Sequence, residues 1–82
     1  MKVRVKLFAS HREAVGKAEV EVEVAGRARV KDLVEQLIAM YPKLGGAMRG
    51  SSIYSLNHKI VDGDAKLSDG DVVSIFPPVG GG

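Results

Sequence analysis

The sequence predicts an α+β domain in which a mixed sheet of four to five strands carries one main helix on one of its faces. Three patterns lead to this prediction. Residues 2–8 and 18–24 alternate apolar and charged side chains, which is typical of half-buried strands. Residues 30–41 repeat apolar side chains at helical spacing. Residues 71–76 alternate again, so that strands both precede and follow the helix.

The first two segments are predicted to pair as an antiparallel hairpin. In "KVRVKLF" (2–8) the outward side chains are mainly Lys and Arg, whereas in "AEVEVEV" (18–24) they are Glu. Opposite charges on facing strands favour this pairing, although each exposed ion pair contributes less than about 1 kcal/mol. The residues predicted to face the core are Val3, Val5, Leu7, Val20, Val22 and Val24.

The segment from Val30 to Tyr41 is predicted to form an amphipathic helix that Pro42 ends. The preceding "AGRAR" offers no good capping side chain, but the carboxylate of Asp32 in the first turn suits the helix dipole. The apolar positions follow the i, i+3, i+4, i+7, i+8 spacing and are Val30, Leu33, Val34, Leu37, Ile38 and Tyr41.

After the helix, residues 43–52 are rich in glycine and serine, and they are predicted to form a loop. Short strands are predicted at 53–57 and 59–61. The turn sequence "SDGD" then introduces the last strand, 71–76. Pro77 ends this strand because proline has no amide hydrogen to donate.

The topology predicts an aromatic pair on the outer face of the sheet. A right-handed crossover through the helix makes the last strand parallel to the first, and both then occupy the middle of the sheet. Val73 and Ile75 face the helix in this arrangement, while Phe8 and Phe76 point away from it near the C-terminal tail. Ile60 is a further candidate for this patch. Contiguous apolar patches mark partner sites, whereas scattered surface aromatics are ordinary.

Composition excludes several classes of function. The 82 residues are enough for one small domain, and the absence of cysteine excludes disulfides, thiolate metal sites and a cysteine nucleophile. A net charge of +2 and the lack of an aromatic stacking motif argue against nucleic-acid binding. The N-terminal segment alternates charged and apolar residues, and no segment reaches membrane-spanning length. A cytoplasmic location away from membranes is therefore expected.

Two "DGD" triplets, at 62–64 and 69–71, invite a calcium interpretation. An EF-hand register that starts at Asp62 would require Gly at the position of Leu67 and Glu at the position of Val73. Turn chemistry is therefore the prediction for both triplets.

The two histidines, His11 and His58, fall on different predicted loops. Neither is accompanied by the Ser, Cys or carboxylate pattern of a catalytic triad or a metal site. Both are predicted to be exposed loop residues, and no metal site is expected.

The chain ends on "FPPVGGG", which suggests a stiff stalk followed by a flexible tip. Pro77 and Pro78 hold the exit path extended, whereas glycines lack a Cβ and can thread a narrow channel. The three glycines would reach on the order of 10 Å. In isolation a terminal triple glycine is most often a frayed end. In this setting it suits delivery of a carboxylate to another protein, so the prediction is a domain at 1–79 and a flexible tail at 80–82.

Taken in order, "LF", "REAVG", the amphipathic helix, "LN", "LSDGD" and "FPPVGGG" resemble the ubiquitin-like sulfur carriers, most closely the small subunits of molybdopterin synthases. The resemblance spans nearly the whole chain and implies a β-grasp fold. It further implies that an ATP-dependent adenylyltransferase related to the ubiquitin activators adenylates Gly82, and that a sulfur donor system converts it to a thiocarboxylate. The large synthase subunit would use that sulfur to build molybdopterin from cyclic pyranopterin monophosphate.

The resemblance assigns roles to individual residues. Gly81 and Gly82 would form the activated terminus, and Gly80 would belong to the threading tail. Gly80 stands where relatives often carry a small polar residue, so a looser tail is expected. The chain would bind no cofactor and would not be an enzyme alone. The residues that would dock partners are Phe8, Ile60, Phe76, Pro77, Pro78 and Val79.

Two other functions remain open at this point. The first is a sister carrier that serves thiamine synthesis or tRNA thiolation, or a modifier that is conjugated to lysines; the "FPPV" stalk favours the pterin pathway over it. The second is a β-grasp interaction module whose glycine tail is idle.

Overall fold

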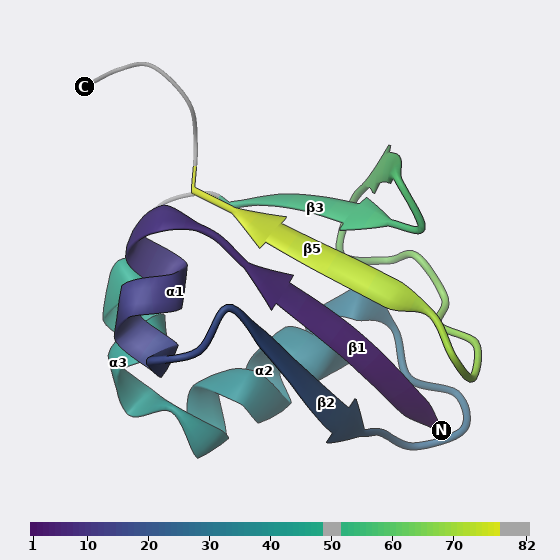
Figure 1. Ribbon diagram of the computed structural model, residues 1–82. Helices are drawn as coiled ribbons and strands as arrows, with labels where there is room; N and C mark the ends of the chain where they lie inside the picture. The colour runs from purple at the N-terminus through teal and green to yellow at the C-terminus, as the bar shows by residue number, and fades with distance from the viewer. Residues whose placement is uncertain (49–51, 78–82) are drawn as a thin grey trace.

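The computed structural model describes residues 1–48 and 52–77. Five strands form one mixed sheet in the order β2-β1-β5-β3-β4. Helix α2 crosses one face of this sheet, and α1 and α3 lie at the end where β1 and β5 finish (Figure 1). The predicted α+β arrangement is confirmed. The elements are β1 (Lys2–Leu7), α1 (Ala9–Val15), β2 (Glu19–Glu23), α2 (Val30–Met40), α3 (Pro42–Ala47), β3 (Ile53–Leu56), β4 (Lys59–Val61) and β5 (Val72–Phe76).

Strands β1 and β2 pair antiparallel, as predicted, with each basic residue of β1 opposite a glutamate of β2. Lys6 lies opposite Glu19 on the outer face, and Val5 lies opposite Val20 on the inner face. The ion pair that forms is diagonal, with 3.5 Å between Nε of Arg4 and a carboxylate oxygen of Glu19. Because both side chains are about half exposed, this ion pair contributes little to stability. The hairpin is stabilised mainly by burial of its valines.

Strand β5 occupies the centre of the sheet. It runs parallel to β1, with Ile75 beside Leu7. On its other edge it pairs antiparallel with β3, where Ile53 lies opposite Phe76. The predicted central position of the first and last strands is confirmed. The C-terminal end of β5 is therefore held by hydrogen-bonded neighbours on both sides.

The hydrophobic core lies between the inner face of the sheet and α2. Leu33 and Leu37 of α2 are fully buried against it. All six aliphatic residues predicted to face inward from the first hairpin are buried as well. Among residues 1–48 and 52–77, the buried apolar residues are Val3, Val5, Leu7, Val20, Val22, Val24, Ala28, Val30, Leu33, Val34, Leu37, Leu44, Leu67, Val73 and Ile75.

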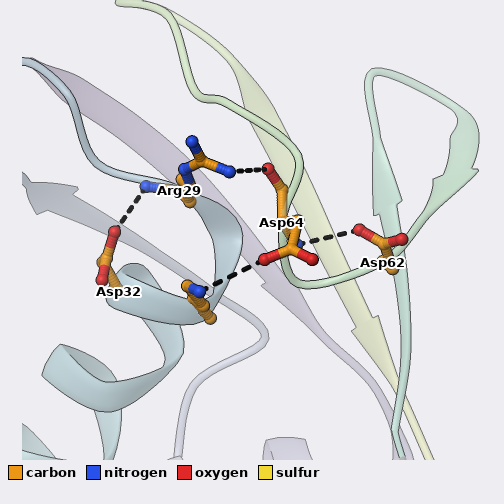
Figure 2. Close-up of polar contacts among 5 residues, drawn as sticks. Arg29, Asp32, Asp62 and Asp64 are labelled. Atoms are coloured by element: carbon orange, nitrogen blue, oxygen red, sulfur yellow. Dashed lines mark hydrogen bonds and ion pairs between the residues drawn. The ribbon is translucent and has the colours of Figure 1, made fainter.

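The N-terminus of α2 is capped by the turn that contains the first DGD triplet (Figure 2). The amide of Val30 donates to the carbonyl oxygen of Ala65 at 2.9 Å. The amide of Lys31 donates to the carbonyl oxygen of Gly63 at the same distance. The carboxylate of Asp32 accepts from the amide of the residue before the helix at 2.8 Å. The 63–65 turn, distant in sequence, and the carboxylate of Asp32 together supply the cap that "AGRAR" lacks.

Both DGD triplets form turns, as predicted. In the first, the carboxylate of Asp62 accepts a hydrogen bond from the amide of Asp64 at 2.8 Å. In the second, the carboxylate of Asp71 accepts from the amide of Ser68 at 2.7 Å. Gly70 has φ +84°, a left-handed conformation that favours glycine. The carboxylates therefore fix backbone amides in turns that join the strands.

Two short helices lie where the sequence predicts loops. The prediction of a loop at 43–52 is wrong for its first part, because α3 occupies it. Pro42 does end α2, at Met40, but proline is well tolerated as the first residue of the next helix. A Cβ built at Gly45 would lie 3.2 Å from Cγ2 of Ile38, so this glycine permits close packing of α3 on α2. Helix α1, of seven residues, was not predicted.

Within residues 1–48 and 52–77, no helix is both long and apolar enough to cross a membrane.

Candidate functional site

Phe8 and Phe76 stack on each other on the sheet face away from α2. Phe8 follows β1 and Phe76 ends β5, and these parallel neighbours bring the two rings together. The ring centroids lie 4.6 Å apart, and the planes are inclined by 14°. Phe8 is 39% exposed, and Phe76 is partly exposed. The predicted solvent-facing pair is confirmed. The backbone of Phe8 is extended, so this residue continues the alternation of side chains along β1.

The C-terminal segment continues directly from this pair. Pro77 follows Phe76 and is partly exposed. The remaining residues to which the sequence assigns a role, Pro78, Val79, Gly80, Gly81 and Gly82, lie outside the described residues. The predicted boundary between domain and tail, after residue 79, also lies outside them. The roles proposed for this segment stay predictions.

Two isoleucines extend the apolar surface around the aromatic pair. Ile53 lies opposite Phe76 across the β3–β5 ladder and shares its face. Ile60 is 73% exposed and lies opposite Ser55 on β4, on the same face but two strands away from β5. We call the surface formed by Phe8, Ile53, Ile60, Phe76 and Pro77 the tail-root face.

Ile53 was missed by the sequence reasoning, and strand alternation alone could not find it. The segment "IYSLN" offers apolar residues on both faces, so the register with β5 decides which of them faces outward. Across the sheet, the outer face of β1 and β2 is charged, whereas that of β5 and β3 carries Val72, Ser74, Ser55 and Ile53. The tail-root face is therefore an apolar area bordered by a charged one, which suits protein docking.

His11 is fully buried, so the prediction of an exposed loop histidine is wrong. Helix α1, which begins directly after Phe8, carries this side chain into the protein interior. Its Nε2 lies 3.1 Å from Oγ of Ser52, just before β3, and its Nδ1 has no hydrogen-bond partner in the described part of the chain. Burial lowers the pKa of His11 because desolvation disfavours the charged ring. A neutral histidine thus ties α1 to the start of β3.

His58 lies in the turn between β3 and β4 and is exposed, as predicted. Among residues 1–48 and 52–77, His, Asp and Glu side chains form no group of three that could hold a metal ion.

Comparisons with known proteins agree along the full chain. The sequence model of the ThiS family matches residues 5–82. The molybdopterin synthase sulfur carrier subunit of Chlamydomonas reinhardtii is 38% identical over 84 residues, with 100% of both chains covered. Small archaeal modifier protein 3 of Haloferax volcanii is 35% identical over 92 residues, again with 100% of both covered.

Two solved structures are similar in fold over the whole chain. The crystal structure of SAMP1 from Haloferax volcanii has a TM-score of 0.89 and 29% identity, and 100% of each chain is covered. A protein–protein complex of subunits 1 and 2 of the molybdopterin-converting factor from Helicobacter pylori has a TM-score of 0.69 and 26% identity, also with 100% of each chain covered.

Proposed function

The chain belongs to the ThiS family and has a ubiquitin-like β-grasp fold, and from this premise we propose that it is a sulfur carrier, the small subunit of a molybdopterin synthase. The observation that carries the proposal is the full-length, 38% identity with a molybdopterin synthase sulfur carrier subunit. The tail-root face supports it, because an apolar surface adjoins the point where β5 leads into the glycine tail.

The proposed chemistry takes place at the carboxylate of Gly82. A free carboxylate is a poor electrophile, so its oxygen is replaced only after activation. An adenylyltransferase of the ubiquitin-activating type would join the carboxylate to AMP from ATP and release pyrophosphate. A sulfide equivalent delivered by a sulfur donor system would then attack the acyl carbon, the bond from that carbon to the AMP oxygen would break, and release of AMP would leave a thiocarboxylate. This sulfur is a competent nucleophile toward cyclic pyranopterin monophosphate in the active site of the large subunit.

The tail-root face would provide the docking surface for these partners. The related Helicobacter pylori structure is a complex of subunits 1 and 2 of its molybdopterin-converting factor, which supports a large-subunit partner for this chain. Phe8 and Phe76 would contribute the apolar anchors, with Ile60 at the periphery. Pro77, Pro78 and Val79 would direct the tail into the partner. Because the reacting group is the terminal acyl carbon, the carrier needs no catalytic side chain.

Intact mass spectrometry tests the carrier chemistry. The chain is incubated with the activating enzyme, ATP and a sulfur source, and the expected product carries one sulfur in place of one oxygen. A matched variant with one additional residue after Gly82 should show no change from its own starting mass, because the acyl group of Gly82 is then held in a peptide bond and is no longer a free carboxylate. An unchanged mass for the wild-type chain under conditions that thiolate a known carrier would support the idle interaction module instead.

A second carrier function is favoured by a specific observation. Small archaeal modifier protein 3 is 35% identical over the full length, and SAMP1 has the TM-score of 0.89. The same thiocarboxylate or adenylate would then serve tRNA thiolation, thiamine synthesis or conjugation to lysines. Reconstitution separates the two functions: the purified thiocarboxylate is added to cyclic pyranopterin monophosphate and a candidate large subunit. Formation of molybdopterin supports the first function, and its absence favours the second.

A further inference from the structure

A hollow of about 380 Å³ lies between the segment that precedes α2 and the segment that precedes β5. The backbone around it is fixed by an isolated β-bridge between Arg29 and Lys66, and the amide of Leu67 donates to the carbonyl oxygen of Ala28 at 3.1 Å. Ala28 and Leu67 are each 6% exposed, so the floor of the hollow belongs to the rigid core. The lining residues are Gly26, Arg27, Ala28, Arg29, Lys66 and Leu67.

Three of these lining residues are cations, and they come from two separate segments of the chain. In the described part of the protein, no carboxylate lies within ion-pair distance of Arg27, Arg29 or Lys66. The guanidinium of Arg29 donates to a carbonyl oxygen, that of Asp64, at 3.3 Å, which orients it without neutralising it (Figure 2).

The nearby carboxylates are engaged elsewhere. A carboxylate oxygen of Asp64 lies 3.2 Å from Nζ of Lys31, and the carboxylate of Asp32 accepts the amide of Arg29 at 2.8 Å (Figure 2). The amides of Val30 and Lys31, the first two of α2, are also satisfied, by carbonyl oxygens of the 63–65 turn. The hollow is therefore defined by its side-chain cations and not by an open helix end.

We propose that this hollow binds a phosphate-type dianion, either inorganic phosphate or a phosphoryl group of a small molecule. Cations that converge on one concavity repel each other, and a compact dianion relieves this repulsion for all three. A guanidinium presents paired N–H donors that match the oxygens of a phosphoryl group. The hollow is concave and of small-molecule size, which favours a compact anion over an extended acidic peptide.

The site is independent of the tail-root face. Its lining segments, 26–29 and 66–67, lie close in sequence to Val24 and Gly70, whose amides donate to the carbonyl oxygens of Met1 and Lys2, so the hollow lies near the N-terminal end of β1. Phe8 follows the other end of this six-residue strand, about 20 Å away at the rise of an extended chain. An anion and a partner docked on the tail-root face would therefore bind simultaneously, and loss of one would leave the other intact.

The test is a titration of the ¹⁵N-labelled full chain with inorganic phosphate near neutral pH, with ionic strength held constant by sodium chloride. We expect saturable shifts of the amides of residues 26–29 and 66–67, with those of Phe8 and Phe76 unmoved. The double variant Arg27→Gln/Lys66→Gln should bind phosphate about tenfold more weakly, because two exposed cation contacts are removed. Both residues are exposed, so the fold should persist, and the same spectra verify this.

The matched control is Lys17→Gln/Lys43→Gln, which removes the same charge from exposed positions outside the hollow and should bind like the wild type. A nucleoside diphosphate forms a second arm: shifts confined to the same amides identify the phosphoryl group as the ligand, and additional shifts identify a larger ligand that carries one. Shifts that never saturate, equal loss in the control, or displacement of phosphate by a glutamate-rich peptide at lower concentration would each overturn the proposal.

Discussion

The stacked pair of Phe8 and Phe76 makes a quantitative prediction about stability. The rings lie 4.6 Å apart and nearly parallel, a geometry in which an aromatic pair contributes about 0.5–1.5 kcal/mol beyond the area it buries. In a double-mutant cycle with Phe8→Leu and Phe76→Leu, each single variant should lose this contribution, and the double variant should not lose it twice. Leucine keeps most of the apolar burial, so the cycle isolates the ring–ring interaction.

Urea unfolding of the four proteins measures this coupling. For a chain of 82 residues, each lost kcal/mol should also lower the melting temperature by about 4–8 °C. Ile60→Ala is the matched control, because this side chain is 73% exposed and should change the free energy of unfolding by less than about 0.5 kcal/mol. A coupling energy below about 0.3 kcal/mol would refute the stack as an energetic unit, since independent sites are additive within that range.

Alanine substitutions on the tail-root face test its docking role. If the large subunit covers the aromatic pair, Phe76→Ala should weaken the complex by at least about 2 kcal/mol, roughly thirtyfold in the dissociation constant. Ile60→Ala, at the periphery, should weaken it much less, because rim residues contribute little. Isothermal titration calorimetry with folded variants provides the measurement. Equal effects of the two substitutions would place the partner elsewhere on the sheet.

Three further predictions concern the scaffold. Burial lowers the pKa of His11 below its ordinary 6.5, so as the pH falls below this value His11 is protonated more readily in the unfolded chain than in the folded one. Stability should therefore be fully present above that pH and decline below it, by at most about 1.4 kcal/mol per pH unit, and urea titrations of His11→Gln should lose this dependence. Gly46→Ala should stabilise the protein by about 0.5–1 kcal/mol, because a Cβ at this position meets open space. Gly45→Ala should stabilise it less, or destabilise it, because the added Cβ would lie against Cγ2 of Ile38. Identical effects of the two substitutions in thermal unfolding would contradict the packing argument. Asp32→Ala should cost about 1 kcal/mol in the same assay through loss of the cap on α2, and a neutral effect would show that the 63–65 turn is sufficient.

The sheet and the main helix were predictable because each has one buried face. The alternation of Val20 and Val22 with glutamates leaves a single way to bury the valines. The i, i+3, i+4, i+7 spacing of Val30, Leu33, Val34 and Leu37 puts all four on one face of a helix, which a strand could not do. Predicted bounds agree with the structure to within one residue at each end of these elements. The pairing of Phe8 with Phe76 followed from the same parity once the last strand was set parallel to the first.

The two short helices were not predictable for a physical reason. A helix of seven residues, such as α1, is unstable alone and depends on contacts made after folding. In α3, two adjacent glycines predict a loop, but Gly45 is there because α2 approaches closely. The wrong prediction for His11 followed from the failure to predict α1. Its residue type and sequence neighbours resemble those of an exposed histidine, and only the helix makes it a buried one.

The central position of β5 has a consequence for the proposed carrier. The chain leaves the sheet from a strand whose last residues, Ile75 and Phe76, pair with Leu7 on one side and Ile53 on the other. To displace the end of β5, a partner that pulls on the tail would have to break the backbone hydrogen bonds to both β1 and β3. A tail that followed an edge strand would be held by the hydrogen bonds to one neighbour only. Two of these residues, Phe76 and Ile53, belong to the tail-root face, so the docking surface and the exit of the tail keep a fixed geometry. The proposed carrier would present one carboxylate first to an activating enzyme and then to a synthase. A fixed geometry between the docking surface and the tail would let each partner that binds the tail-root face receive the carboxylate in its active site.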